Sequence, residues 1–212
     1  MKWEEFLKIA GRLPVIDTNA LLPGVTDVAA LKVQISRWQK AGKIIQLKKG
    51  IYVLADSYRK VTINEFYIAT VLKRPSYLSM EKALEYYNLI PERVTVYTSL
   101  TTKRGGRFIS GIGDFEYRHI KKTLFWGYES VKWQGQTVFI ATPEKALMDL
   151  VYENKIKVSL SYLEELRLQN TESVNLDKLV EYARRFKKPK MLSAALLIKE
   201  FLTSDKEGEK SL

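Results

Sequence analysis

Residues 27–54 read DVAALKVQISRWQKAGKIIQLKKGIYVL, and this stretch decides the fold expected for the N-terminal part of the chain. A capping residue, Thr26 or Asp27, precedes apolar residues at helical spacing, and a glycine suits the end of that helix. Two β-rich runs, 44–47 and 51–54, then flank a basic turn that contains a glycine. The stretch therefore predicts a helix followed by a β-hairpin.

Two shorter helices are expected upstream. Apolar residues recur at helical spacing over residues 3–10, and a Gly and a Pro soon after them end the first helix. Asp17 or Thr18 caps a second helix through Leu22, which a Pro-Gly pair stops. Three helices followed by a hairpin is the order of a winged helix-turn-helix, so we expect a DNA-binding domain of this kind at residues 1–58.

The helix over residues 27–41 has two distinct faces. Leu31, Ile35 and Trp38 project together and are expected to pack on the first two helices. Arg37, on the outward side, suits bidentate reading of guanine, whereas Lys32 and Lys40 suit phosphates. The full set of residues expected to contact DNA is Lys32, Val33, Ser36, Arg37 and Lys40 on the helix, with Lys48 and Lys49 at the hairpin tip. The alternative for each is a solvated side chain.

Charge and composition narrow the functional classes. The chain has a net charge of +11, and residues 1–60 hold 11 Lys/Arg against 5 Asp/Glu, which favours an acidic partner such as double-stranded DNA. It has no cysteine and one histidine, His119, which excludes disulfides, thiolate zinc sites and multi-histidine metal cages. We therefore expect no catalytic residue, no metal site and no cofactor, and the protein is not expected to be an enzyme.

The hydropathy pattern gives no expected membrane segment. The longest stretch without a charged residue is Trp133–Pro143, well short of the ~20 residues that cross a bilayer. No N-terminal run resembles an export signal. A soluble protein of the cytoplasm, with no membrane partner, is the expectation.

Residues 61–204 are expected to form a larger mixed α/β domain with a central sheet and C-terminal helices, followed by a frayed polar tail at residues 205–212. The overall fold class is therefore α+β. The expected helices are 65–72, 79–87 and most of the chain after residue 143; the expected strands are 94–99, 115–120, 124–128 and 137–140.

Five short runs resemble the AbiEi antitoxin family. They are Gly50–Val53 (GIYV), Tyr77–Glu92 (YLSMEKALEYYNLIPE), Tyr97–Arg104 (YTSLTTKR), Phe125–Tyr128 (FWGY) and Ala141–Leu150 (ATPEKALMDL). They span nearly the whole chain in the expected order.

The resemblance implies a two-part protein. In that family the winged helix binds promoter repeats and represses an operon that also encodes a nucleotidyltransferase toxin. The C-terminal domain counteracts the toxin, by direct contact or by indirect opposition, and assists cooperative DNA binding, so a dimer or a cooperative assembly on DNA is implied. The alternative within the family is a solitary regulator without a toxin partner.

Other residue groups have weaker signals. A basic turn suits a second partner or nucleic-acid surface, formed by Lys103, Arg104, Arg107, Arg118, Lys121 and Lys122; its Gly-Gly pair lacks the spacing of a P-loop, and a solvated turn is the alternative. A metal-dependent nuclease centre, another alternative, would use Asp114, Glu116 and Glu129 with Lys132, but their spacing is not that of such sites.

Two further alternatives concern the role of the aromatic residues and the class of binding partner. Five aromatic residues suit either base stacking or, as we favour, core packing: Tyr86, Tyr87, Phe125, Trp126 and Tyr128. His119 is expected to lie on the surface. A module that binds protein rather than DNA is the third functional class, and it predicts little salt dependence.

Overall fold

The structure is a computed structural model that describes residues 1–21, 27–155 and 157–209. In this part of the chain the helices are α1 (Trp3–Ala10), α2 (Thr18–Leu21), α3 (Val28–Lys40), α4 (Glu65–Leu72), α5 (Met80–Tyr86), α6 (Pro143–Glu153), α7 (Leu160–Leu166), α8 (Leu176–Arg185) and α9 (Pro189–Glu209). The strands are β1 (Ile16–Asp17), β2 (Ile44–Lys48), β3 (Ile51–Leu54), β4 (Ser76–Leu78), β5 (Val96–Thr101), β6 (Gly106–Ser110), β7 (Gly113–His119), β8 (Tyr128–Trp133) and β9 (Gln136–Ala141).

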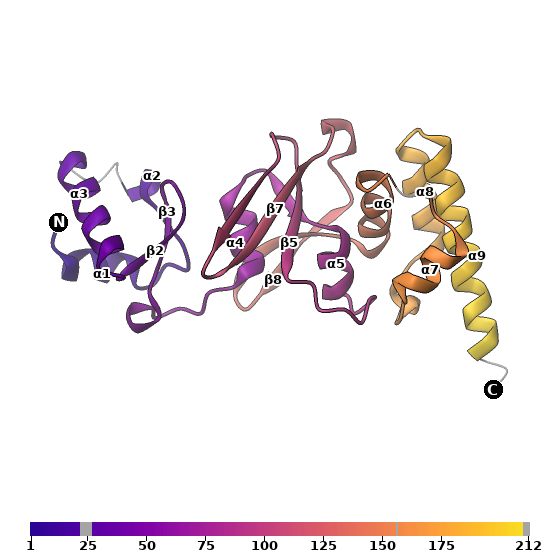
Figure 1. Cartoon of the computed structure of the whole chain (residues 1–212), viewed down its shortest axis with the longest axis horizontal. Coiled ribbons are helices and arrows are strands. Elements are labelled where there is room, and N and C mark those ends of the chain that lie inside the picture. The colour runs from indigo at the N-terminus through magenta and orange to yellow at the C-terminus, as the bar shows by residue number, and fades with distance from the viewer. Residues whose placement is uncertain (22–26, 156, 210–212) are drawn as a thin grey trace.

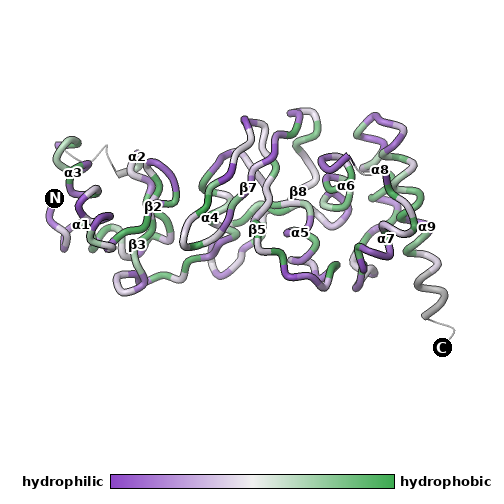
Figure 2. Tube along the Cα trace, in the orientation of Figure 1, coloured by the Kyte–Doolittle hydropathy of each residue, from purple (hydrophilic) through white to green (hydrophobic). Residues whose placement is uncertain are grey.

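The molecule is elongated, with three regions in line (Figure 1). The region from α1 to β3 lies at one end, the larger sheet lies in the middle, and α6 to α9 cover the other end. The expected α+β class, with a mixed sheet followed by helices, is confirmed. Green, hydrophobic segments run along β2 and β3, whereas β5 and β7 of the larger sheet are coloured white to purple and purple, hydrophilic segments gather in the loops at the ends of the sheet (Figure 2).

The N-terminal region has its own small core. Leu31, Ile35 and Trp38 are buried as expected, and they pack with Phe6 and Ala10 of α1. Asp27 caps α3 by accepting a 2.8 Å hydrogen bond from the backbone N–H of Ala30. The expected second helix is α2, but Leu22, the Pro-Gly pair after it and Thr26 lie outside the described residues.

Strand β1 is a feature that the sequence did not predict. It is two residues long and pairs antiparallel with β3, with Ile16 opposite Tyr52, which gives a three-stranded sheet of order β1-β3-β2. This pairing places the start of α2 next to the hairpin turn.

The hairpin is buried on both faces. Ile44 and Leu54 belong to the N-terminal core, whereas Leu47, Ile51 and Val53 belong to the core of the larger region. Because successive side chains of a strand point to opposite faces, one hairpin serves two cores. The boundary expected between residues 58 and 61 is therefore crossed by a packed interface.

The larger sheet has the order β6-β7-β5-β4-β9-β8. The pairs β5·β7 and β4·β9 are parallel and the other three are antiparallel. Helix α4 lies on the side toward the N-terminal region, and α5 and α6 lie beyond the sheet on the other side (Figure 1).

Two expectations for this region are corrected. Strands β4 and β6 were not predicted, because one has three residues and the other begins at the glycine of the basic turn. The strand expected at 124–128 is wrong: Phe125 and Trp126 turn into the core, Gly127 adopts a φ of +74°, and the strand begins only at Tyr128. At the C-terminus, α9 continues to Glu209, into the polar tail expected to fray from residue 205; residues 210–212 lie outside the described chain.

Candidate nucleic-acid interface

The outward face of α3 is exposed along its whole length. Lys32, Ser36, Arg37 and Lys40 are all exposed, and the exposed fraction of Val33 is 51%. The opposite face is fixed by the buried side chains of the N-terminal core, with the ring centroids of Phe6 and Trp38 4.6 Å apart. Within the described residues no carboxylate forms a salt bridge with any of these three cations. The face thus presents uncompensated positive charge.

A hollow of about 590 Å³ separates α3 from the hairpin turn. Its lining includes Lys32, Ser36 and Gln39 from α3, Lys49 from the turn, and Thr18 and Asn19 from the start of α2. The structure therefore brings together three residues that the sequence predicted, Lys32, Ser36 and Lys49, from two separate elements. We call this hollow the helix–turn groove.

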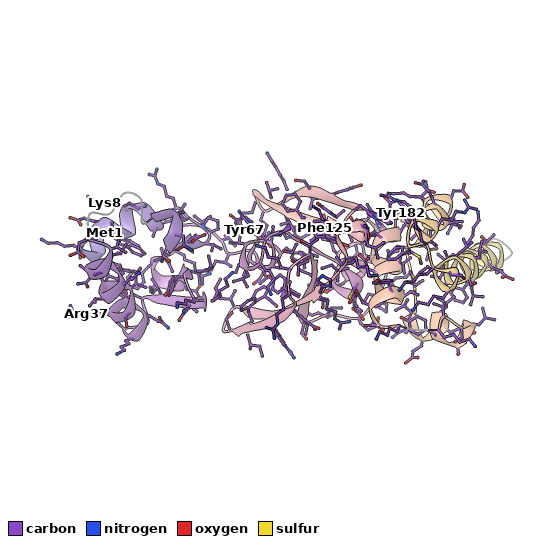
Figure 3. The ribbon with its side chains drawn as sticks, turned by 90° about the horizontal axis from the view of Figure 1, so that it is seen from above. Met1, Lys8, Arg37, Tyr67, Phe125 and Tyr182 are labelled. Carbon is purple, nitrogen blue, oxygen red and sulfur yellow. The ribbon has the colours of Figure 1, made fainter. Side chains whose placement is uncertain are left out.

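The other predicted residues of α3 lie outside the groove. Consecutive helical residues are about 100° apart, so Arg37 lies on the flank of α3 away from Lys32. Figure 3 shows Arg37 at the outer edge of the N-terminal region. Lys40 and Val33 lie between the two flanks. The exposed face is thus broad, with one cationic side in the groove and another at the free edge.

The groove is held open by local hydrogen bonds. The backbone N–H and the hydroxyl of Thr18 both donate to the carbonyl of Gly50, at 2.9 and 3.0 Å. Gly50 has a φ of +85°, and a Cβ there would lie 3.3 Å from the Thr18 hydroxyl oxygen. Gln39 donates a 3.1 Å hydrogen bond to the side chain of Gln46 in β2. These contacts fix the turn against α2 and strand β2 against α3.

Thr18, Asn19 and Gln39 are groove residues that the sequence reasoning missed. Gln39 is next to the predicted Lys40, and helical spacing could have placed it beside Lys32 and Ser36. Thr18 and Asn19 reach the groove only because β1 pairs with β3. A strand of two residues is too short for the sequence to predict this pairing.

Lys48 does not extend into the groove. Its side chain is half-buried, its ammonium group donates a hydrogen bond to the carbonyl of Leu72 at the end of α4, and it lies 5.7 Å from the ring centroid of Phe108. Lys49, its neighbour, is exposed. The two lysines expected at the hairpin tip therefore have different environments.

Several cations meet where the hairpin reaches the sheet. Lys73 donates a 2.7 Å hydrogen bond to the carbonyl of Arg104. Burial lowers the pKa of Lys73, and the positive charges of Lys48, Lys103 and Arg104 lower it further. A second hollow of about 410 Å³ lies here, with Lys48, Lys49, Arg74 and Lys103 in its lining. We call Lys48, Lys73, Arg74, Lys103 and Arg104 the junction cations.

The residues of the predicted second basic surface divide into two groups. Thr101 and His119 are opposite each other in the β5·β7 pair, so the segments after them, which hold Lys103, Arg104, Lys121 and Lys122, leave the sheet at one end. Arg107 and Arg118 are instead paired with carboxylates: Arg107 Nε donates to Asp114 at 2.8 Å, and Arg118 Nε donates to Glu116 at 2.9 Å. Four of the six cations thus lie exposed at this end, with His119, also exposed, beside them.

The carboxylates of the nuclease alternative are not brought together. Asp114 and Glu116 are in β7, whereas Glu129 and Lys132 are in β8, with three strands between. Four inter-strand spacings amount to roughly 19 Å. In the part of the chain that the structure describes, no group of three or more His, Asp or Glu side chains is placed to share a metal ion.

The aromatic cluster belongs to the core, as favoured. Tyr86, Tyr87, Phe125, Trp126 and Tyr128 are all half-buried and pack against the large core. Trp126 packs on Tyr182 with ring centroids 4.9 Å apart.

A buried polar network connects two of the runs that carry the family resemblance. Lys145 and Asp149, one turn apart on α6 and both 0% exposed, form a salt bridge. Tyr77 accepts a 2.9 Å hydrogen bond from Lys145 and donates one to Asp149, which also accepts a 2.8 Å bond from Ser79. Burial lowers the pKa of Lys145 and raises the pKa of Asp149. These runs therefore encode core contacts.

Comparison with known proteins gave no assignment: no protein-family model matches the chain, and no curated protein matches it. None of the helices formed by residues 1–21, 27–155 and 157–209 has both the length and the apolar character needed to cross a membrane.

Proposed function

We propose that this protein is a DNA-binding transcriptional repressor whose α3 enters the major groove of a duplex. The observation that carries the proposal is the helix–turn groove, because it places Lys32, Ser36 and Lys49 from two elements on one hollow. A phosphate backbone lying in that hollow would receive two ammonium groups and one hydroxyl donor. Phosphate contacts of this kind supply most of the affinity of a duplex-binding protein.

The element order supports a winged helix-turn-helix. The chain runs α1, β1, α2, α3, β2, β3, with the three strands in one small antiparallel sheet. In such a domain the second helix of the pair reads base edges. Here that helix is α3, and Arg37 at its free edge has the planar donor fork that pairs with guanine.

The hairpin tip contributes through one lysine. Lys49 is exposed beside the groove, so we assign it the contact with the flanking phosphate. Lys48 is engaged with the Leu72 carbonyl, so its expected DNA contact passes to Lys49 and its own part is to join the hairpin to the sheet. Lys103, Arg104, Lys121 and Lys122 remain candidates for a second contact with the same duplex or with a partner.

The resemblance to AbiEi antitoxins extends the proposal to the larger region. The repressor would then autoregulate an operon and counteract a nucleotidyltransferase toxin. The runs YLSMEKALEYYNLIPE and ATPEKALMDL meet in the buried network of Lys145 and Asp149, so they support a shared core more than a shared toxin contact. Co-expression with a neighbouring nucleotidyltransferase separates the antitoxin from a solitary regulator: rescue of growth supports the former, and its absence the latter.

Duplex binding is tested by measuring the affinity of the full chain for DNA from its own promoter between 50 and 200 mM salt. The proposal predicts a linear fall of log affinity with log salt, with a slope of about −0.9 per phosphate neutralised. An interaction module that binds protein would give no such slope. Lys157→Ala, which removes an exposed cation far from α3 in the chain, is the matched control and should leave the slope unchanged.

A further inference from the structure

A small aromatic pocket opens beside the start of β4. It has a volume of about 330 Å³ and is lined by the rings of Phe125, Tyr128 and Phe139, together with Pro75 and the side chain of Arg74. This volume falls at the lower end of the range for small-molecule sites, about 300–1,000 Å³, which combine apolar walls with a few polar groups. None of these residues has a part in the proposed DNA contact.

The walls of the pocket are held by stacked rings. Tyr77, 0% exposed, lies behind them, with its ring centroid 4.7 Å from Tyr128 at an interplanar angle of 12° and 5.2 Å from Phe125. Tyr128 and Phe139 meet edge to face at 6.1 Å. The three pocket rings are only half-buried, so each retains accessible surface. Rings fixed in this way favour a planar aromatic guest, which gains stacking energy beyond the area it buries.

The rim of the pocket is positively charged. Arg74 is exposed, and among the described residues no hydrogen bond or salt bridge engages its guanidinium group. It also lines the hollow of about 410 Å³ that holds Lys48, Lys49 and Lys103. An anion attached to the aromatic guest would therefore meet a free bidentate donor first and further ammonium groups beyond it.

The pocket continues toward the N-terminal region. An adjoining hollow of about 680 Å³ shares Thr70, Arg74 and Phe139 with it and is also lined by Arg12 and Pro14. A guest larger than one ring therefore has space to extend between the two regions. Figure 3 shows Phe125 within the central region and Tyr67, which lines this adjoining hollow, on the side toward the N-terminal region.

The geometry points to a binding site for a nucleoside phosphate, with the base among Phe125, Tyr128 and Phe139 and the phosphate on Arg74. The inference does not depend on duplex binding, because none of these residues lines the helix–turn groove.

The site is tested by isothermal titration of the full chain, without DNA, using ADP and GDP, with adenosine and inorganic phosphate as partial ligands. We expect saturable binding of a nucleoside diphosphate, with adenosine and phosphate each at least tenfold weaker. Arg74→Gln should weaken binding at least tenfold. Arg93 is an exposed arginine that precedes the first residue of β5, at the end of that strand away from Arg74. Arg93→Gln should therefore leave nucleotide binding unchanged.

A ring-specific pair of variants completes the test. Phe139→Leu should weaken nucleotide binding at least fivefold, whereas Tyr128→Phe, which keeps its ring, should retain it. Circular dichroism confirms that each variant is folded. The inference is overturned if neither nucleotide binds at millimolar concentration, or if phosphate alone binds as well as the nucleotide and Phe139→Leu has no effect.

Discussion

The ammonium group of Lys48, at the tip of the β2–β3 hairpin, donates a hydrogen bond to the carbonyl oxygen of Leu72, the last residue of α4. A cation at a helix C-terminus satisfies a carbonyl that has no partner within the helix and lies favourably in the helix dipole. The contact joins the N-terminal region to the sheet region. It also separates the role of Lys48 from that of the adjacent Lys49.

The two lysines therefore provide a matched pair of variants. Lys48→Ala should lower the free energy of unfolding by about 1.5–3 kcal/mol, as expected for a hydrogen bond from a charged donor, and should speed hydrogen exchange around residues 72–73. Lys49→Ala should leave stability unchanged within about 0.5 kcal/mol, as surface substitutions do, and should reduce the salt slope of duplex binding by about one. Urea unfolding and salt titration measure the two effects. The division would be contradicted if Lys49→Ala lowered stability and Lys48→Ala reduced the salt slope.

Arg37 is predicted to read a base. Arg37→Ala should cost about 1–3 kcal/mol on the natural operator and should blur the base preference at one position. Fluorescence anisotropy with the operator and with single-base variants measures both effects. Unchanged affinity and unchanged base preference would show that the free edge of α3 does not face the bases.

The geometry of the groove depends on the contact between Thr18 and Gly50. Gly50→Ala forces a left-handed φ on a residue with a Cβ and brings that Cβ against the Thr18 hydroxyl, so we expect destabilisation of about 1–2 kcal/mol. Thr18→Val, which keeps the shape but loses the hydroxyl donor, should cost about 1 kcal/mol. Urea unfolding measures both losses. A Gly50→Ala protein as stable as the parent would mean that the turn has another conformation.

The buried pair in α6 is predicted to be costly to break. Lys145→Met leaves the Asp149 carboxylate buried without its cation and should lower the free energy of unfolding by about 3–5 kcal/mol. The double variant Lys145→Met/Asp149→Leu removes both charges and should be more stable than the single variant. If the double variant were less stable than the single variant, the two charges would not be offsetting the free-energy cost of burying each other.

Stability is predicted to fall at alkaline pH. Burial raises the pKa of Tyr97 to about 12, with Glu65 and Glu85 adding to the effect, and burial also raises the pKa of Tyr162 to about 12. In the unfolded chain these phenols ionise near pH 10. The unfolded state therefore releases its protons first, and stability declines as pH rises from about 10 to about 12.

Ultraviolet absorbance of phenolate during a pH titration, run beside urea unfolding at each pH, checks this sign. Tyr97→Phe should reduce the slope of the decline. A free energy of unfolding that stays constant between pH 9 and pH 12 would contradict it.

Patterns among neighbouring residues were sufficient to predict the helices and the hairpin. The spacing of Leu31, Ile35 and Trp38 predicted which face of α3 is buried, and the helix expected from residue 143 is α6, which begins at Pro143. These features depend on neighbours within a few residues, which the sequence shows directly. The same spacing predicted which residues of α3 would be exposed.

The features that the sequence did not predict depend on contacts between residues far apart in the chain. Strand β4 forms because Ser76–Leu78 lies between β5 and β9. A run of three residues is too short for its hydropathy pattern to predict that position. The docking of Lys48 required the hairpin to be apolar on both faces. The adjacent pairs Ile44-Ile45 and Val53-Leu54 carried that signal, because a hairpin with one solvated face would alternate with polar residues.

Combined removal of Lys32 and Lys49 is the most direct test of duplex binding in the helix–turn groove. The double variant Lys32→Ala/Lys49→Ala, titrated against promoter DNA between 50 and 200 mM salt, should bind more weakly and lose about two from the magnitude of the salt slope. Parent-like affinity and slope in a folded double variant would contradict the account.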